Sequence, residues 1–340
     1  MKKNLSLLLF AFTFIISCGI VFAADFSDVP ATNENYLAIK YLQSQQVING
    51  YADGTYKPDQ VVNRAEAMKF ILESNKVKLP ETVEASKFSD VSPTDWFIKY
   101  LAKAIELKVV AGNPNGTFAP GRSVTKAEFM KMLLNSSGFK ADKWAGQQLF
   151  PDVAKDAWYA AYMNYAGQAG IVSKDDQGNL KPADNMTRGA VAQSIYLLKI
   201  ILNGKDTQFL LDQAELQMAQ VENYIIGKLP LAAKKASELS VDLTQQALKN
   251  LPSSNVVLAA AKLARGYDYL VNAFITALQK KNDESYQWAQ QAITKATEAW
   301  QANNEIQPIA KHIKERANEI IAQLPGAGTQ QTTQQAVVPK

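Results

Sequence analysis

The sequence has one cysteine and one histidine, Cys18 and His312, among its 340 residues. A lone cysteine excludes a disulfide framework, and a lone histidine leaves too few ligands for a Cys/His zinc site and no complete His-based triad. We therefore expect no catalytic residues, no metal site and no cofactor. Basic residues number 36 and acidic residues 32, with no basic run, so the composition argues against a nucleic-acid partner.

The first residues read as an export signal. Two lysines are followed by an apolar run over residues 5–21 and by the small residue Ala23. This order predicts a secretory signal peptide over residues 1–23, cleaved after Ala23, and hence an exported, nearly neutral mature chain. The stretch Ile15-Ile16-Ser17-Cys18 faintly resembles a bacterial lipobox, whose cysteine would be lipidated, and this alternative stays open.

One pattern occurs three times at a strict spacing. Arg64, Lys126 and Arg188 lie 62 residues apart (126 − 64 and 188 − 126), each inside a motif of the type Thr-Arg-Ala-Glu. A repeat of this size is typical of one supersecondary unit packed against its copies. The same step relates the phenylalanines, aspartates, glycines and prolines at Phe26, Phe88 and Phe150; Asp28, Asp90 and Asp152; Gly54, Gly116 and Gly178; and Pro58, Pro120 and Pro182.

Each copy of the motif predicts a helix start. Thr125 with Glu128, and Asn63 with Glu66, fit a capping box, whereas the third copy has Thr187 but an alanine in place of the glutamate. The basic residue then falls at the first helical position, where the helix dipole disfavours a cation. Two explanations stay open: a solvated surface cation, or an anion site made of the side chain and the free N–H groups of the helix start.

Each copy also predicts an earlier helix, a glycine turn and an aspartate that serves the turn. Aromatic and apolar residues at helical spacing follow each Asp-Val, beginning at Trp96 in the second copy and Trp158 in the third. Asp-Gly and Asn-Gly then mark a tight turn before the capped helix. We expect three two-helix repeats, at about residues 25–80, 87–140 and 149–203, in an all-α fold.

These motifs, in this order and in triplicate, resemble the S-layer homology (SLH) family of bacterial cell-wall anchoring modules. The resemblance covers residues 25–203 and implies one pseudo-threefold helical spindle with grooves between neighbouring repeats. It implies binding of secondary cell-wall polysaccharide, often through a pyruvate ketal carboxylate that meets the basic residue of the motif. Carried over, the ligand-binding residues are Arg64, Lys126 and Arg188. We expect Arg64→Ala and Arg188→Ala each to weaken wall binding with little loss of fold.

Other residues complete the candidate polysaccharide-binding set, and some depart from the family pattern. Trp96 and Trp158 are candidates for stacking on sugars, with packing of their helix as the alternative, and the loop glycines Gly54, Gly116 and Gly178 join the set. Lys126 offers a point charge in place of a planar fork. The first copy has Glu34 where the others have tryptophan, which predicts a weaker first groove unless Tyr36 substitutes for the missing aromatic residue.

Beyond Asn203-Gly204 the composition shifts to Ala, Gln, Leu and Lys. Apolar stripes at helical spacing, broken at Pro230, Pro252 and Asn303, predict a bundle of four or five helices over residues 205–325, including a shorter helix near Ala236 to Leu248. Residues 326–340 lack this pattern and are expected to be disordered.

The sequence thus favours a non-enzymatic protein of the bacterial cell wall, cell surface or S-layer. Its expected partner is secondary cell-wall polysaccharide, pyruvylated or not, or peptidoglycan, and the helical bundle would be a structural or partner-binding part. One alternative is an effector whose helical domain carries an unrecognised binding or catalytic activity. Another is a tether whose helices associate with copies of themselves.

Overall fold

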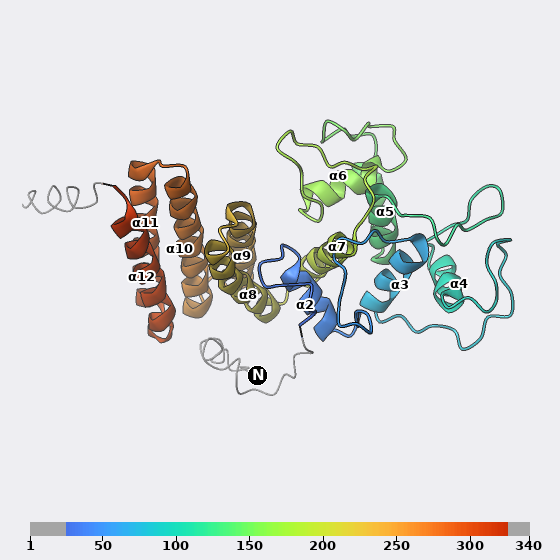
Figure 1. The fold of residues 1–340 in the computed structure, drawn as a ribbon, viewed down its shortest axis with the longest axis horizontal. Helices are drawn as coiled ribbons and strands as arrows, with labels where there is room; N and C mark the ends of the chain where they lie inside the picture. Colours follow the sequence, from blue (N-terminus) through green and yellow to red (C-terminus); the bar gives the residue numbers. More distant parts are fainter. Residues whose placement is uncertain (1–24, 326–340) are drawn as a thin grey trace, which may run out of the picture. The chain divides into compact units, whose positions relative to one another are not determined.

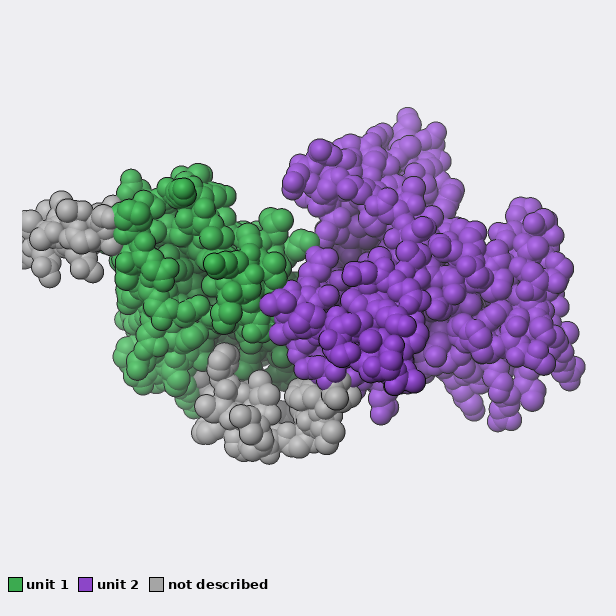
Figure 2. Space-filling model, viewed as in Figure 1, with its two compact units in different colours: residues 1–21, 202–340 green, residues 22–201 purple. Residues whose placement is uncertain are grey.

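Apolar residues at helical spacing produce helices throughout residues 25–325, the residues that the computed structural model describes (Figure 1). In this part of the chain every regular element is a helix, which confirms the all-α prediction. The chain divides into two units between Ile201 and Leu202 (Figure 2). The predicted signal peptide and the tail after residue 325 lie outside the described residues, and the expected domain bounds stay predictions.

The repeat unit contains two helices from each repeat. The first helices are α2 (Tyr36–Ser44), α4 (Ile98–Glu106) and α6 (Ala160–Gln168), and the second helices are α3 (Arg64–Ser74), α5 (Lys126–Ser136) and α7 (Arg188–Leu202). A short 3₁₀-helix, η1 (Ala141–Trp144), precedes the third repeat. Trp96 and Trp158 lie in turns before α4 and α6, so the expectation that they begin these helices is wrong by two residues.

Three backbone hydrogen bonds close a ring at the centre of the repeat unit. The N–H of Val62 donates to Met186 O (2.9 Å), that of Met186 to Val124 O (3.0 Å), and that of Val124 to Val62 O (3.1 Å). Each donor and its acceptor come from different repeats, and all three side chains are buried. Because each repeat can close this ring only with the other two, the unit has the pseudo-threefold arrangement expected of the spindle.

The second helix of each repeat packs on the first helix of the next. Helix α3 contacts α4, and α5 contacts α6. The cycle is completed by α7 and α2, where the rings of Tyr196 and Tyr41 lie 5.2 Å apart. We call each of these places a junction: junction 1–2 holds Arg64, junction 2–3 holds Lys126, and junction 3–1 holds Arg188.

The second unit contains five α-helices among its described residues, as expected. They are α8 (Thr207–Ile226), α9 (Pro230–Asn250), α10 (Asn255–Leu278), α11 (Asn282–Ala302) and α12 (Gln307–Gln323), with η2 (Asn304–Ile306) before the last. Each helix packs on the next, and α10 also contacts α8 and α12. Helix α9 is longer than the expected Ala236–Leu248, because Pro230 starts it at a position where its missing N–H costs nothing.

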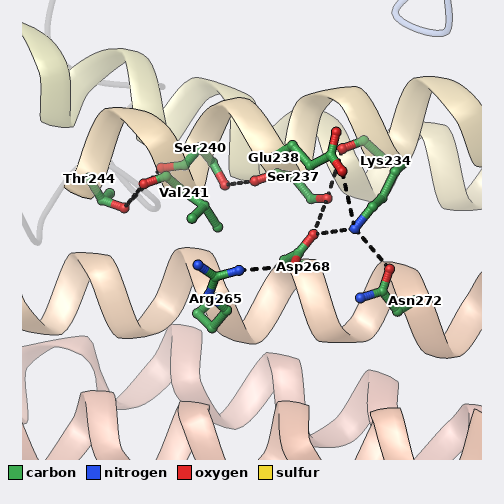
Figure 3. A network of polar contacts seen from close by, with 9 residues as sticks. All are labelled: Lys234, Ser237, Glu238, Ser240, Val241, Thr244, Arg265, Asp268 and Asn272. Carbon is green, nitrogen blue, oxygen red and sulfur yellow. Dashed lines mark hydrogen bonds and ion pairs between the residues drawn. The ribbon is translucent and has the colours of Figure 1, made fainter. Parts of the chain in front are cut away.

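A buried carboxylate ties α9 to α10 (Figure 3). Asp268 on α10 is 5% exposed and accepts from Lys234 Nζ (2.9 Å) and Ser237 Oγ (3.0 Å) on α9, and from Arg265 Nη1 (3.4 Å). Lys234 also donates to Asn272 Oδ1 at 2.9 Å. Since the charge of Asp268 is met by two cations and a hydroxyl, this network fixes the register of the two helices.

Candidate functional site

The three basic residues at the helix starts reach across the junctions. Arg64 Nε donates to Phe118 O and its Nη2 to Ala111 O, both at 3.1 Å. Lys126 Nζ donates to Leu180 O at 2.7 Å, and Arg188 Nε donates to Tyr56 O at 2.7 Å. In every case the acceptor belongs to the following repeat, so each side chain fastens one repeat to the next.

The two arginines are buried, and Lys126 is half-buried. Arg64 and Arg188 are each 8% exposed, which contradicts the interpretation of solvated surface cations. The guanidinium carbon of Arg188 lies 4.5 Å from the ring centroid of Tyr56 and 4.9 Å from that of Tyr51, and that of Arg64 lies 4.8 Å from Phe118. Burial lowers the pKa of Arg64 and of Lys126 from their ordinary values.

The helix starts do not offer free N–H groups. At junction 1–2 the N–H groups of Arg64 and Ala65 donate to the carbonyls of Arg122 (3.0 Å) and Pro120 (3.1 Å) of the next repeat. The same pair of bonds recurs at the other two junctions. The third N–H is taken by the cap, confirmed as a full capping box at Asn63 and Thr125. An anion site built from these N–H groups is therefore wrong, and only the side chains can serve a ligand.

The guanidinium groups nevertheless keep donors for a ligand. Within the described residues neither Arg64 nor Arg188 lies in an ion pair, and the side chain of Arg188 donates only through Nε. Of the buried side-chain polar atoms described, the hydroxyl of Tyr267 alone lacks a protein partner. The Nη atoms of Arg188 have no acceptor among the described residues and are not among these fully buried atoms, so their N–H groups are left for an anion that accepts from two of them.

An aspartate holds the acceptor of each cation in place. The two oxygens of Asp90 accept from the N–H groups of Phe118 and Ala119, both at 2.7 Å. Ala119 has φ +58°, a left-handed conformation that the paired acceptors stabilise. Asp28 and Asp152 hold the equivalent residues in the same way. Their interpretation as turn residues is confirmed, and the hydrogen bonds with Phe118 lower the pKa of Asp90.

The two tryptophans lie open at the edges of junctions. Trp96 and Trp158 are each 56% exposed, so packing accounts for less than half of their surface. Lys69 Nζ, on α3, lies 5.8 Å from the ring centroid of Trp96, and Lys131 Nζ, on α5, lies 5.1 Å from Trp158. Each indole thus faces a lysine on the second helix of the preceding repeat, the helix that begins with Arg64 or with Lys126.

The position of Glu34 corrects one expectation. The first helix of each repeat packs on the second helix of the preceding one, so Glu34, which stands before α2, belongs to the junction of Arg188. The neighbouring Asn35 lies against Gly189 of α7, where an added Cβ would come within 2.6 Å of Asn35 Nδ2. The missing tryptophan therefore affects junction 3–1 and leaves junction 1–2 with its indole.

The three loop glycines serve the turns. Gly54, Gly116 and Gly178 have φ values of +78°, +81° and +83°, which confirms the turn prediction. The carbonyls of Gly54 and Gly116 accept from Ser27 and Ser89 at the start of the same repeat. This explains the recurrence of glycine, and a part in ligand binding stays a prediction.

Sequence reasoning missed the residue beside each cation. The carbonyls that accept from the backbone N–H groups of Arg64, Lys126 and Arg188 belong to Arg122, Asp184 and Gln60, three residues at equivalent positions with different charges. Arg122 forms a two-pronged ion pair with Glu128, with Nη1 at 3.1 Å and Nη2 at 2.6 Å from the carboxylate oxygens. The 62-residue step would have aligned these positions, but nothing in the sequence placed them beside the cation of the previous repeat.

The second unit contains fewer candidate functional residues than the repeat unit. Asp283 and Glu284 lie in the first turn of α11, as predicted. His312 Nε2 lies 3.1 Å from Glu222 Oε1, so the histidine joins α12 to α8. Within residues 25–325 no group of three His, Cys, Asp or Glu side chains is placed to hold a metal ion. None of the helices described has the length and apolarity of a membrane span.

Comparison with known proteins identifies the repeats. Residues 25–68, 87–130 and 149–192 each match the S-layer homology domain, so the chain carries three tandem SLH domains, and the predicted resemblance is confirmed. Domains of this kind, together with S-layer relatives, place the protein outside the cell at the bacterial surface, as expected.

Several proteins of different kinds are similar to this chain over part of its length. The chain is 32% identical over 150 residues to cell surface glycoprotein 1 of Acetivibrio thermocellus, covering 42% of this chain and 6% of that protein. It is 29% identical over 230 residues to S-layer protein EA1 of Bacillus anthracis, covering 67% and 25%. It is also 33% identical over 108 residues to an endoglucanase of a Bacillus species, covering 32% and 11%. The chain therefore spans a quarter or less of each of these relatives.

Proposed function

We propose that residues 25–203 anchor the protein non-covalently to secondary cell-wall polysaccharide, by binding negatively charged sugar substituents at the junctions between repeats. The observation that carries this proposal is the guanidinium of Arg188, which is held at its junction by a neutral carbonyl and by no acid among the described residues, and whose Nη atoms have no acceptor there and are not fully buried. A carboxylate is the planar acceptor that matches this fork, and a pyruvate ketal on a sugar supplies one.

In this proposal three kinds of residue contribute to polysaccharide binding. Arg64, Lys126 and Arg188 supply the charge, Trp96 and Trp158 supply exposed faces on which a sugar ring stacks, and the loops of Gly54, Gly116 and Gly178 shape the edge. The SLH match and the names of relatives, a cell surface glycoprotein and an S-layer protein, support attachment to the wall. The helical unit is then a structural or partner-binding part of a protein without enzymatic activity.

The anchoring test is sedimentation of the full mature chain with purified walls, before and after chemical removal of the ketal pyruvate. We expect the bound fraction to fall once pyruvate is removed. Undiminished sedimentation would reject the carboxylate mechanism, and binding to walls stripped of polysaccharide would point to peptidoglycan.

The tryptophans provide the sharper variants, because the arginines also hold the fold together. Trp96→Ala and Trp158→Ala should weaken sedimentation with little change in melting temperature, since both indoles are more than half exposed. Leu107→Ala is the matched control, because Leu107 is an exposed apolar side chain of the same unit at the end of α4, 41% exposed. If the Trp variants and the control bind equally, the indoles have no part in the site.

The endoglucanase among the relatives keeps one alternative in view, namely that the domains only target an effector carried by the helical unit. A screen of the mature chain for hydrolysis of wall polysaccharide and peptidoglycan tests it. Release of reducing ends, lost on deletion of the helical unit, would replace the non-enzymatic proposal.

A further inference from the structure

The three junctions share one scaffold but differ in charge at one position. The carbonyls of Arg122, Asp184 and Gln60 accept the N–H of the junction cation at 3.0, 2.7 and 2.9 Å. These bonds hold the backbone of each of the three residues beside Arg64, Lys126 or Arg188. Only the side chain varies, and it is positive, negative and neutral in turn.

At junction 1–2 the second charge is another guanidinium. The side chain of Arg122 is 44% exposed and is held by Glu128, the capping-box residue of α5. Arg122 acts against the charge on Arg64 and Glu128 supports it, as their opposite effects on the pKa of Arg64 indicate. The three groups together carry one net positive charge.

At junction 2–3 the equivalent residue is Asp184, whose negative charge repels an anionic ligand. Asp184 is exposed and acts on Lys126 with the sign that favours the charged ammonium, although burial is the larger effect on the pKa of Lys126. Ala190 replaces the capping glutamate here, and the carboxylates of Asp184, Asp152 and Asp175, opposed by Lys181, act on Lys126, so the acidic groups outnumber the basic ones. At junction 3–1 Gln60 is uncharged, and its Oε1 accepts from the hydroxyl of Tyr51 at 3.3 Å.

Resting on the anchoring function proposed above, we propose that residues 122 and 184 set the affinity of their junctions for an anionic sugar. Arg122 makes junction 1–2 the stronger site, and Asp184 makes junction 2–3 the weaker one. A unit charge at about 6 Å in water changes binding roughly threefold, and by more where the ligand displaces solvent. The effect on these exposed groups shrinks in high salt, because ions screen charges beyond a few ångströms.

Trp96 and Trp158 allow the two junctions to be followed separately. The mature chain is labelled with fluorotryptophan and titrated with a small sugar that carries a pyruvate ketal, with its uncharged methyl ester as the control ligand. Fluorine NMR reports each of the 5 tryptophans, and Trp→Phe variants assign the signals. In the parent we expect the Trp96 signal to shift at lower ketal concentration than the Trp158 signal.

Two substitutions decide the proposal. Arg122→Gln should raise the midpoint of the Trp96 titration about threefold, and Arg122→Lys should restore it. Asp184→Asn should lower the midpoint of the Trp158 titration about threefold, a gain that misfolding cannot produce.

Equal midpoints in the parent, or midpoints unmoved by both substitutions, would overturn the ranking of the junctions while leaving the anchoring function intact. The same shifts with the methyl ester would show that charge is not the cause, and would overturn it too. If neither fluorine signal shifts on addition of the ketal and the sedimented fraction is the same with and without pyruvate, both the anchoring mechanism and this ranking are wrong.

Discussion

Arg188→Met should destabilise the repeat unit strongly, which reverses the expectation, drawn from sequence alone, of little loss of fold. The side chain crosses junction 3–1 and is 8% exposed. Methionine keeps much of its volume but removes the hydrogen bond from Nε to Tyr56 O at 2.7 Å. It also removes the cation from the faces of Tyr56, Tyr51 and Phe70, whose ring centroids lie within 5.2 Å of the guanidinium carbon.

The magnitude follows from these two losses. A charged hydrogen bond to a buried carbonyl contributes about 1.5–3 kcal/mol, and a desolvated cation over aromatic rings about 0.5–2 kcal/mol. Allowing for the solvation that the arginine regains in the unfolded chain, we expect a loss of about 2–4 kcal/mol. Lys126→Met should cost less, about 1–2 kcal/mol, because Lys126 makes one such bond and faces Leu180 in place of an aromatic ring.

Chemical and thermal unfolding followed by circular dichroism measures both variants. Arg122→Met is the matched control, since the exposed side chain of Arg122 pairs with Glu128 of its own repeat and makes no side-chain bond across a junction, and it should stay within about 1 kcal/mol of the parent. For a unit of this size Arg188→Met should lower the melting temperature by roughly 5–12 °C. A melting temperature equal to that of the control would refute the assignment of Arg188 as a fastener between repeats.

The remaining predictions concern other contacts. Thr125→Ala should lower the free energy of unfolding by about 1 kcal/mol in the same assay, because Thr125 Oγ1 accepts from Glu128 N at 3.3 Å and caps α5. An unchanged melting temperature would show that the cap does not stabilise the unit. The pKa of Asp90 is lowered in the fold by its hydrogen bonds with Phe118, so its stabilisation is present above the unfolded pKa and is lost as pH falls through the folded one. Asp90→Asn should therefore melt lower at neutral pH and show a smaller drop on acidification, and parallel pH curves would contradict this. Asp268→Asn should lower the free energy of unfolding of the helical unit by about 1–3 kcal/mol, because it weakens the bonds to Lys234 and Arg265. Wall sedimentation should stay unchanged, and a change in it would contradict this prediction. Analytical ultracentrifugation of the mature chain tests self-association through the helices, and a strictly monomeric result would remove the tether alternative.

Local features of the chain were predictable because they depend on neighbours in sequence. The capping boxes at Asn63 and Thr125, the turn glycines such as Gly116, and the acidic first turn of α11 all involve groups a few residues apart. The 62-residue period predicted three equivalent units. Helix bounds were less certain where a turn and a helix share the same apolar spacing, as at Trp96, or where a proline starts a helix, as at Pro230.

What the sequence by itself determined is therefore the repeat, its caps and turns, and the presence of a cation at each equivalent helix start. Only the tertiary structure decided which repeat each cation meets, and that Glu34 lies at the junction of Arg188. It also showed that the N–H groups of the helix starts are already occupied. The physical reason is that these contacts join residues more than 50 positions apart, such as Arg64 and Phe118. The hydrogen-bonded ring of Val62, Val124 and Met186 brings these residues together, and no pattern within a single repeat indicates the pairing.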